Sequence, residues 1–233
     1  MTPAAPLIRP LGDAAVLVEL GSVVDLEVNR RVRALAARVA DATAGETGWG
    51  PPIPGACSFL VPVDPLDPGV AVASTRLLTL VEEMGRVSRL GTAIDDDPEI
   101  IEIPTRYDGP DLDAVAEMTG LTPAEVAERH AAITYTTLFL GFVPGFGYLG
   151  PLPRELTVPR RPMPRTQVPA GSVAIAGAQT AVYPLDSPGG WWVIGRTDVA
   201  LWDPRREPPA LLRPGGRVRF VVEPKLVVEP KPR

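Results

Sequence analysis

The chain has 233 residues and a formal net charge of −5, with 45% hydrophobic residues, 22 glycines and 29 prolines. The hydrophobic fraction is ordinary for a globular protein, and the acidic net charge argues against a general nucleic-acid binder. A single cysteine excludes an internal disulfide framework and fits a reducing compartment, and a single histidine argues against a multi-ligand zinc site.

The N-terminal residues, MTPAAPLIRPLGD, lack the basic segment followed by an apolar segment that marks a signal peptide. No uninterrupted apolar run approaches the roughly 18 residues that a membrane helix needs. We therefore expect a cytoplasmic protein with neither a membrane nor a nucleic-acid partner.

The N-terminal part of the chain alternates between strand and helix patterns. The expected elements are a strand at Ala14–Leu20 after the turn Pro10–Asp13, a helix with Val28, Val32, Leu35 and Val39 on one face that ends near Gly45, a strand at Cys57–Val63, a helix with Leu77, Val81 and Met84 on one face, and a strand at Ile100–Tyr107. This order predicts a small α+β sandwich of the ferredoxin-like βαββαβ type. No charged constellation stands out here, so we interpret this part as a scaffold or subunit-contact domain.

An acidic turn, Asp95–Pro98, marks the expected domain boundary. It divides the chain into a small α/β N-terminal domain, residues 1–97, and a mainly β domain, residues 98–233. Early in the second domain, Thr122-Pro-Ala-Glu125 predicts a helix start, with Thr at the N-cap, Pro at the first helical position and Glu placed for a capping box. This helix is expected to run to about His130.

The rest of the second domain is expected to be a β-barrel. Short strands separated by turn signals are expected at Ile133–Leu140, Ser172–Ala176, Trp191–Arg196 and Val218–Val222. This pattern predicts a closed or strongly bent barrel. The repeated tail VVEPK-L-VVEPK is interpreted as an edge extension or a loose end.

Two glycine motifs resemble nucleotide sites but lack the required context. Gly145–Gly150 matches G-x-G-x-x-G, yet Pro-Leu-Pro follows where a helix must begin to receive a pyrophosphate. Gly190–Thr197 resembles a phosphate-binding loop with Arg196 in the lysine position, but its bulky, β-prone residues favour a strand that ends in an exposed arginine. Spacing alone supports no Ser-His-Asp or Cys-His relay, and no biotin-attachment sequence is present.

The stretch from Gly141 to Thr197 is the expected functional surface. Glycine and proline recur every few residues in it, and between them lie aromatic and arginine side chains: Phe142, Phe146, Tyr148, Trp191, Trp192, Arg154, Arg160, Arg161, Arg165 and Arg196. Rigid loops that carry aromatic walls and guanidinium groups indicate a binding or catalytic surface. Residues 154–165 hold four arginines and one acid, which favours an anionic ligand.

Several blocks of the chain match one known family. They are His130 with Tyr135, Gly141-Phe-Val-Pro-Gly-Phe-Gly-Tyr-Leu149, Pro159-Arg160 with Pro164-Arg165, Val168-Pro-Ala-Gly-Ser172, Gln179-Thr180, Tyr183-Pro184, Ser187-Pro-Gly-Gly-Trp191 and Gly195-Arg-Thr197, with Arg9-Pro-Leu-Gly-Asp13 and Tyr107-Asp-Gly-Pro-Asp-Leu112 nearer the N-terminus. On these blocks the chain resembles the family formed by the B subunit of the ATP-dependent 5-oxoprolinase. That family includes allophanate hydrolase subunit 1 and the KipI-type inhibitor of a sporulation histidine kinase.

The resemblance implies a cyclophilin-like β-barrel behind a smaller α/β domain. It also implies an obligate partner, the C subunit of the same enzyme, with a related barrel, and a third partner, the A subunit, that phosphorylates the lactam. ATP would be a co-substrate of the complex that binds on a partner subunit, because this chain offers no phosphate loop, metal site or biotin site. Two residues depart from the family pattern: Ala181 and Gly216 stand where glycine and aspartate are usual.

The chemistry implied by the resemblance assigns roles to particular side chains. The expected catalytic residues are His130, Arg160, Arg165, Gln179 and Arg196. The expected substrate-binding residues are Phe142, Phe146, Tyr148, Thr180, Ser187, Gly189 and Gly190. Guanidinium groups suit phosphate and carboxylate, and a histidine titrates near neutrality. Each role has a structural alternative: salt-bridge arginines, turn-stabilising hydroxyl and amide groups, a helix-capping histidine, packed aromatics and backbone-shaping glycines.

The leading hypothesis is therefore a subunit that helps to open 5-oxo-L-proline to L-glutamate and is inactive alone. Two alternatives remain open. One is a KipI-like regulatory inhibitor of a sensor histidine kinase, and the other is a carboxyltransferase subunit of the allophanate hydrolase or urea carboxylase type.

Overall fold

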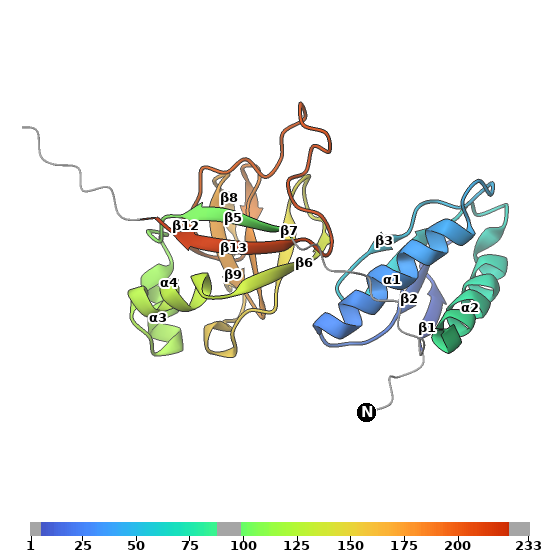
Figure 1. Ribbon diagram of the computed structural model, residues 1–233, viewed down its shortest axis with the longest axis horizontal. Coiled ribbons are helices and arrows are strands. Elements are labelled where there is room, and N and C mark those ends of the chain that lie inside the picture. Colours follow the sequence, from blue (N-terminus) through green and yellow to red (C-terminus); the bar gives the residue numbers. More distant parts are fainter. Residues whose placement is uncertain (1–5, 88–98, 224–233) are drawn as a thin grey trace, which may run out of the picture. The chain divides into compact units, whose positions relative to one another are not determined.

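The computed structural model describes residues 6–87 and 99–223. The chain forms two compact units (Figure 1): an N-terminal unit, Met1–Pro98 with Leu138–Leu140, and a C-terminal unit, Glu99–Thr137 with Gly141–Arg233. The boundary expected after residue 97 stays a prediction, because residues 88–98 lie outside the described part. Most of the repeated tail lies outside it as well.

The N-terminal unit is a four-stranded antiparallel sheet with two helices. The sheet has the order β1-β2-β4-β3. Its elements are β1 (Leu7–Pro10), β2 (Ala15–Glu19), α1 (Leu26–Ala42), β3 (Ile53–Pro54), β4 (Ser58–Pro62) and α2 (Gly69–Val87). Alternate residues of β2, Val16 and Val18, are fully buried and pack with Val32 and Val39 of α1 and Leu77 of α2. This apolar core joins the sheet to both helices.

The sequence predicted four of these six elements. The expected strands at Ala14–Leu20 and Cys57–Val63 and both expected helices are confirmed, whereas β1 and β3 are short and were missed. The ferredoxin-like arrangement is not confirmed, because the described order is β-β-α-β-β-α. The strand expected at Ile100–Tyr107 forms β5 (Ile100–Thr105), which pairs in parallel with β13 of the C-terminal unit.

A nearly closed seven-stranded sheet forms the body of the C-terminal unit, in the order β12-β9-β10-β7-β6-β13-β5. Its other strands are β6 (Thr134–Leu140), β7 (Gly147–Gly150), β9 (Ser172–Ala176), β10 (Gln179–Val182), β12 (Trp192–Arg196) and β13 (Arg217–Val222). The two ends of the order meet where Arg106 and Arg196 exchange backbone hydrogen bonds of 2.9 Å. A separate two-stranded ribbon pairs β8 (Arg165–Val168) with β11 (Ser187–Gly189). The expected barrel-like sheet is therefore present.

Two helices, α3 (Leu112–Thr119) and α4 (Pro123–Ala131), follow β5, and a 3-10 turn, η2 (Arg154–Leu156), follows β7. The helix start predicted from Thr122 is confirmed, because its hydroxyl accepts from the backbone of Glu125 and the Glu125 carboxylate accepts from the backbone of Thr122. Helix α3 was not predicted. Within the described residues, none of the helices combines the length and the apolar character that crossing a bilayer requires.

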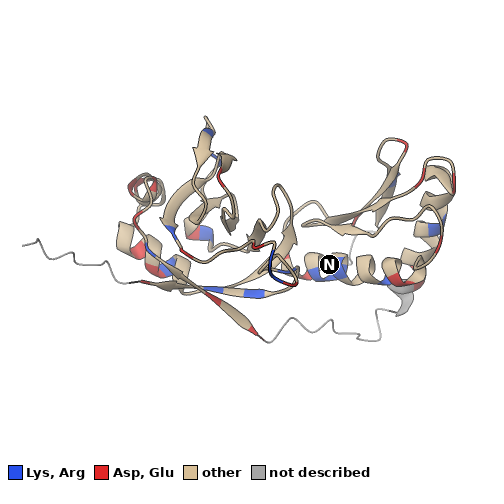
Figure 2. Cartoon of the chain, turned by 90° about the horizontal axis from the view of Figure 1, so that it is seen from above, with Lys and Arg blue, Asp and Glu red and all other residues tan. Residues whose placement is uncertain are grey.

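Charged residues are spread over both units (Figure 2). In the N-terminal unit, α1 carries four arginines between Glu27 and Asp41. The described ion pairs of this unit are at the surface, as in Arg9–Glu19, where the side chains are 53% and 30% exposed. In the C-terminal unit some charged groups lie much deeper. These buried groups define the candidate site.

Candidate functional site

The site is organised around the loop that leaves β5 and runs along β12. The amide of Gly109 donates to the carbonyl of Ile194, and the amide of Asp111 donates to the carbonyl of Val193 at 3.0 Å. A Cβ added at Gly109 would lie 2.3 Å from the carbonyl oxygen of Val193. Only glycine allows this approach, so residue 109 fixes the loop against the strand.

A cavity of about 570 Å³ opens beside this loop. Its walls include Arg106, Asp108, Arg165, Gln167, Arg196 and Asp198. Two arginines that the sequence singled out, Arg165 on β8 and Arg196 at the end of β12, therefore face one cavity although 31 positions separate them in the chain. A cavity of this size lined by convergent charged groups has the dimensions of a small-molecule site.

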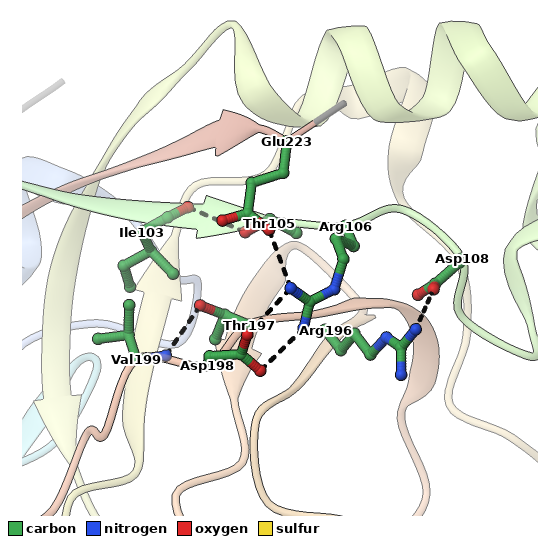
Figure 3. A network of polar contacts seen from close by, with 9 residues as sticks. All are labelled: Ile103, Thr105, Arg106, Asp108, Arg196, Thr197, Asp198, Val199 and Glu223. Atoms are coloured by element: carbon green, nitrogen blue, oxygen red, sulfur yellow. Dashed lines mark hydrogen bonds and ion pairs between the residues drawn. The ribbon is translucent and has the colours of Figure 1, made fainter. Parts of the chain in front are cut away.

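Ion pairs surround the place where the barrel closes (Figure 3). Arg106 binds both oxygens of Asp198, at 2.8 and 2.9 Å, and also reaches Glu223 at 3.1 Å. Arg196 donates to Asp108 at 2.7 Å, and the Arg196 side chain is 61% exposed. The guanidinium of Arg106 lowers the pKa of the Asp198 carboxyl below its usual value through hydrogen bonding. The predicted strand ending in an exposed arginine is confirmed.

Asp111 is the most deeply buried carboxylate of the site, with a side chain that is 5% exposed. It accepts two hydrogen bonds from Arg165 and one from Arg161, each of 2.7 Å. A fourth bond of 2.7 Å comes from the backbone N–H of Val193. Hydrogen bonding by Asp111 raises the pKa of Arg165 above its usual value, so the guanidinium remains charged.

Aromatic side chains form a cluster in the barrel that extends to its surface. Phe146 is 2% exposed and makes edge contacts with Phe142, Tyr148, Tyr183 and Trp191, with ring centroids between 5.0 and 5.7 Å apart. At the outer edge Phe142 is 57% exposed and has a φ of 71°. A left-handed backbone at a residue with a side chain costs roughly 1–2 kcal/mol, and such strain is typical of functional loops.

His130 lies outside this cluster and is fully buried. Its Nε2 lies 2.8 Å from the Thr180 hydroxyl, and its Nδ1 lies 2.7 Å from the Tyr107 hydroxyl. Because Thr180 donates its hydroxyl hydrogen to the carbonyl of Ala174, Nε2 must donate to Thr180 and Nδ1 must accept from Tyr107. Burial lowers the His130 pKa to about 3. A neutral histidine with both nitrogens occupied supports packing rather than proton transfer.

The other predicted residues take several positions. Gly189 lies against Tyr183, since a Cβ there would be 2.2 Å from the phenol oxygen, and the carbonyl of Gly190 accepts from the amide of Arg161. The hydroxyl of Ser187 is buried and has no hydrogen-bond partner within the described chain. Gln179 is half-buried at the start of β10. Arg160 is exposed and close enough to lower the pKa of Tyr148 and Tyr183, although burial dominates and raises both.

The two residues that depart from the family pattern lie in different places. Ala181 is fully buried and belongs to the same core cluster as Phe146, so its methyl group fills part of the barrel interior. A Cβ added at Gly216 would lie 3.0 Å from the carbonyl oxygen of Arg213, so a side chain there requires a small shift.

Sequence reasoning missed Asp111, Arg106 and Asp108 as members of the site. The signal available for them was the block Tyr107–Leu112, an acidic loop with glycine and proline between a strand and a helix. Nothing local in that block shows that its acids meet arginines about 50 or more positions away.

Neither glycine motif leads into an α-helix, and Trp192–Arg196 of the second motif is strand β12. The segment Gly147–Gly150 is strand β7 and the short turn η2 follows it, so no α-helix starts there to receive phosphates. Among the described residues, no group of three or more histidine, cysteine, aspartate or glutamate side chains is placed to hold a metal ion.

Comparison with known proteins gives a consistent family. The carboxyltransferase domain family, subdomain C and D, matches residues 6–212. The B subunit of 5-oxoprolinase from Escherichia coli O157:H7 is 41% identical over 214 residues, which cover 91% of this chain and 93% of that protein. The protein with the same description in Bacillus subtilis (strain 168) is 38% identical over 223 residues, 92% of this chain and 91% of that protein.

Solved structures resemble the whole chain as well. The structure of TTHA0988 is 37% identical with a TM-score of 0.75 and covers 97% of this chain, which itself spans 42% of that longer chain. The urea carboxylase of Kluyveromyces lactis has a TM-score of 0.75 at 21% identity, over 94% of this chain and 22% of that one. The second likeness is evidence of the fold alone.

Proposed function

Because this chain belongs to the carboxyltransferase domain family, subdomain C and D, and within it to the 5-oxoprolinase B subunits, we propose that it is the B subunit of an ATP-dependent 5-oxoprolinase. In this role it helps to open 5-oxo-L-proline to L-glutamate together with the A and C subunits and is inactive alone. The observation that carries the proposal is the near full-length match to the B subunit from two different bacteria. The shared cavity of Arg165 and Arg196 supports it.

The proposed site is the cavity beside β12. The lactam of 5-oxoproline is unstrained and carries a carboxylate, so hydrolysis needs activation by ATP and cationic groups for the charges that result. Arg196 suits the substrate carboxylate, because its exposed pair with Asp108 contributes little stability and is readily exchanged. Arg165 suits charge that develops at the activated carbonyl, because Asp111 fixes its orientation. Arg160 is a third candidate cation.

The other predicted residues have smaller roles in this proposal. Phe142, Phe146 and Tyr148 form an apolar wall that extends to the surface, and Gly189 and Gly190 shape the backbone beside it. Gln179 and Ser187 remain candidate hydrogen-bonding groups. His130 and Thr180 form a hydrogen bond with each other in the interior, so we assign both a structural role in the barrel.

Partners and location belong to the same proposal. ATP is proposed to bind on a partner subunit, which agrees with strand β12 where Gly190–Thr197 resembles a phosphate-binding loop. We assign the complex to the cytoplasm, since a chain with one cysteine is suited to a reducing compartment. A cyclophilin-like topology is the proposed finer classification of the barrel. No specific observation favours the kinase-inhibitor alternative, and the urea carboxylase likeness is one of fold.

The test is reconstitution of the complex from purified subunits. We expect ATP-dependent release of glutamate from 5-oxoproline with all three subunits, loss of that release when this chain is omitted, and recovery when it is added back. An Arg205→Ala chain is the matched control, because Arg205 is 88% exposed and pairs only with nearby Asp203 among the described residues. Undiminished turnover without this chain would contradict the proposal.

A further inference from the structure

Asp111 lies at a helix N-terminus, where local sequence rules predict that its carboxylate caps the helix. It is the N-cap residue of α3, and aspartate at an N-cap normally accepts from the backbone N–H groups of the first turn, which is worth about 1 kcal/mol. Here the carboxylate makes no capping hydrogen bond. It turns away from its own helix and binds Arg161, Arg165 and β12 instead. The helix gives up a local stabilisation for these distant contacts.

The contact with β12 is made through both backbone groups of one residue. The amide of Asp111 donates to the carbonyl of Val193 at 3.0 Å, and the Asp111 carboxylate accepts from the amide of Val193 at 2.7 Å. The register of β12 against β9 shifts between Val193 and Gly195. Irregularities of this kind redirect the side chains that follow, and the next side chain after Gly195 is Arg196. Asp111 therefore binds the backbone of β12 just before Arg196, one of the two cavity arginines.

The contact with β8 fixes the other cavity arginine. The two Nη atoms of Arg165 bind the two oxygens of Asp111, which is the bidentate arrangement that sets the plane of a guanidinium. This pairing uses two of the five N–H groups of Arg165. The side chain is 27% exposed and faces the cavity.

Arg161 contributes to the charge around this carboxylate. It donates to Asp111, and its guanidinium lies 5.0 Å from the centroid of the Trp192 ring. One carboxylate is thus set against two guanidinium groups, which leaves a net positive charge next to the cavity. Burial makes that charge more effective than the same charge would be in water.

We infer that Asp111 is a positioning residue of this protein, which holds Arg165 by its guanidinium fork and β12 by its backbone so that Arg165 and Arg196 address one anionic substrate in the shared cavity. The inference rests on the proposed function and deepens it. It assigns the substrate-facing role to the arginines and assigns their orientation to Asp111, which reaches the substrate only through them.

A double-mutant cycle in the reconstituted complex tests this inference. The variants are Asp111→Asn, Arg165→Lys and the combination, and the readouts are kcat and the KM for 5-oxoproline. The Asn amide cannot accept from both Nη groups, and the Lys ammonium keeps the charge without the fork. Each single variant is expected to raise KM at least about tenfold. The KM of the double variant is expected to be no higher than that of the more impaired single variant, because both substitutions disrupt the same Asp111–Arg165 pair.

A matched control separates positioning from folding. Val115 is fully buried in the same helix α3, so Val115→Ala is expected to lower thermal stability while KM stays within about twofold of the wild type. If Asp111→Asn fails to fold, Arg165→Lys still tests the inference, because an unchanged KM in that variant would overturn it. Asp111 keeps its bonds to Arg161 and to Val193 in Arg165→Lys, so the buried carboxylate stays paired.

The outcomes distinguish this inference from the proposed function. An inactive wild-type complex would remove the proposed function. An active wild-type complex in which Asp111→Asn and Arg165→Lys multiply their effects, or in which either leaves KM unchanged, would overturn the positioning role and leave the function standing.

Discussion

The two units of the chain place their polar side chains differently. In the N-terminal unit the core residues of β2, β4 and both helices are almost entirely aliphatic or aromatic, and the described ion pairs, such as Arg76–Glu46 with both side chains 38% exposed, lie at the surface. Of the ten buried polar or charged side chains among the described residues, eight belong to the C-terminal unit. They include a carboxylate, Asp111, and a histidine, His130.

This difference indicates which unit is shaped by something besides stability. A buried polar group costs free energy unless it is fully paired, and an apolar group of similar size is often as stable in its place. Among its described residues the N-terminal unit buries only two such groups, the uncharged Asn29 and Thr43, which agrees with a scaffold role. The C-terminal unit accepts that cost at Asp111, beside a cavity that carries two of the predicted arginines.

Removing the buried carboxylate is expected to have the largest effect. Asp111→Ala should lower the free energy of unfolding of the C-terminal unit by about 3–5 kcal/mol, because two guanidinium groups and the Val193 amide lose their partner. Urea unfolding followed by tryptophan fluorescence measures this, since Trp191, Trp192 and Trp202 all belong to that unit. Asp113→Ala, an exposed acid of the same helix, is the control and should change stability little. A loss of less than about 1 kcal/mol for Asp111→Ala would show that the cluster is not a structural unit.

A core truncation in the N-terminal unit is expected to affect stability but not catalysis. Leu77 is fully buried between α2 and the sheet, so Leu77→Ala should destabilise this unit by about 2–5 kcal/mol. The kcat/KM of the reconstituted complex, measured well below the unfolding temperature, should stay within about twofold of the wild type. A loss of kcat/KM comparable to that of a cavity variant would show that the N-terminal unit also contributes to catalysis.

Burial of His130 predicts a specific pH dependence. Its pKa is lowered from 6.5 to about 3 on folding, so the unfolded chain binds a proton that the folded chain does not. This contribution to stability is fully present above pH 6.5 and is lost as pH falls, at up to about 1.4 kcal/mol per pH unit between pH 6 and pH 4. In His130→Gln, which retains a donor for Thr180, unfolding midpoints should fall less steeply over that range. Equal slopes for the two proteins would show that His130 is protonated in the folded state.

The smallest effect is expected for the surface ion pair of the N-terminal unit. Arg76 lowers the pKa of Glu46 through a hydrogen bond, but solvent screens a pair this exposed. Glu46→Gln should therefore leave the unfolding midpoint unchanged within error at physiological salt. A clear destabilisation would show that surface charge also matters structurally in this unit.

Features that depend on neighbouring residues were readable from the sequence. Thr122 and Glu125 determine the start of α4 by local hydrogen bonds, and the short apolar runs of β2 and β9 between turn residues identify them as strands. Short elements such as β1, β3 and β11 contain proline and few apolar residues, so local patterns do not reveal them.

Features that depend on distant contacts were not readable. Asp111 meets Arg161, Arg165 and Val193, which lie 50 or more positions away, and its place at a helix N-cap suggests only capping. The parallel pairing of β5 with β13 likewise joins the two ends of the C-terminal unit, whereas its position in the chain suggests the N-terminal sheet. The buried state of His130 also follows from tertiary packing, since helix periodicity alone does not distinguish a capping histidine from a core one.

A pair of arginine substitutions decides whether the C-terminal unit carries the site. The two arginines, each in an ion pair, are Arg196, which lines the cavity, and Arg76, which pairs with Glu46 in the N-terminal unit. In the reconstituted complex, we expect Arg196→Ala to lower kcat/KM for 5-oxoproline about a hundredfold, on the order of 3 kcal/mol, and Arg76→Ala to leave it within about twofold. Equal effects of the two substitutions, or full activity of Arg196→Ala, would contradict the account.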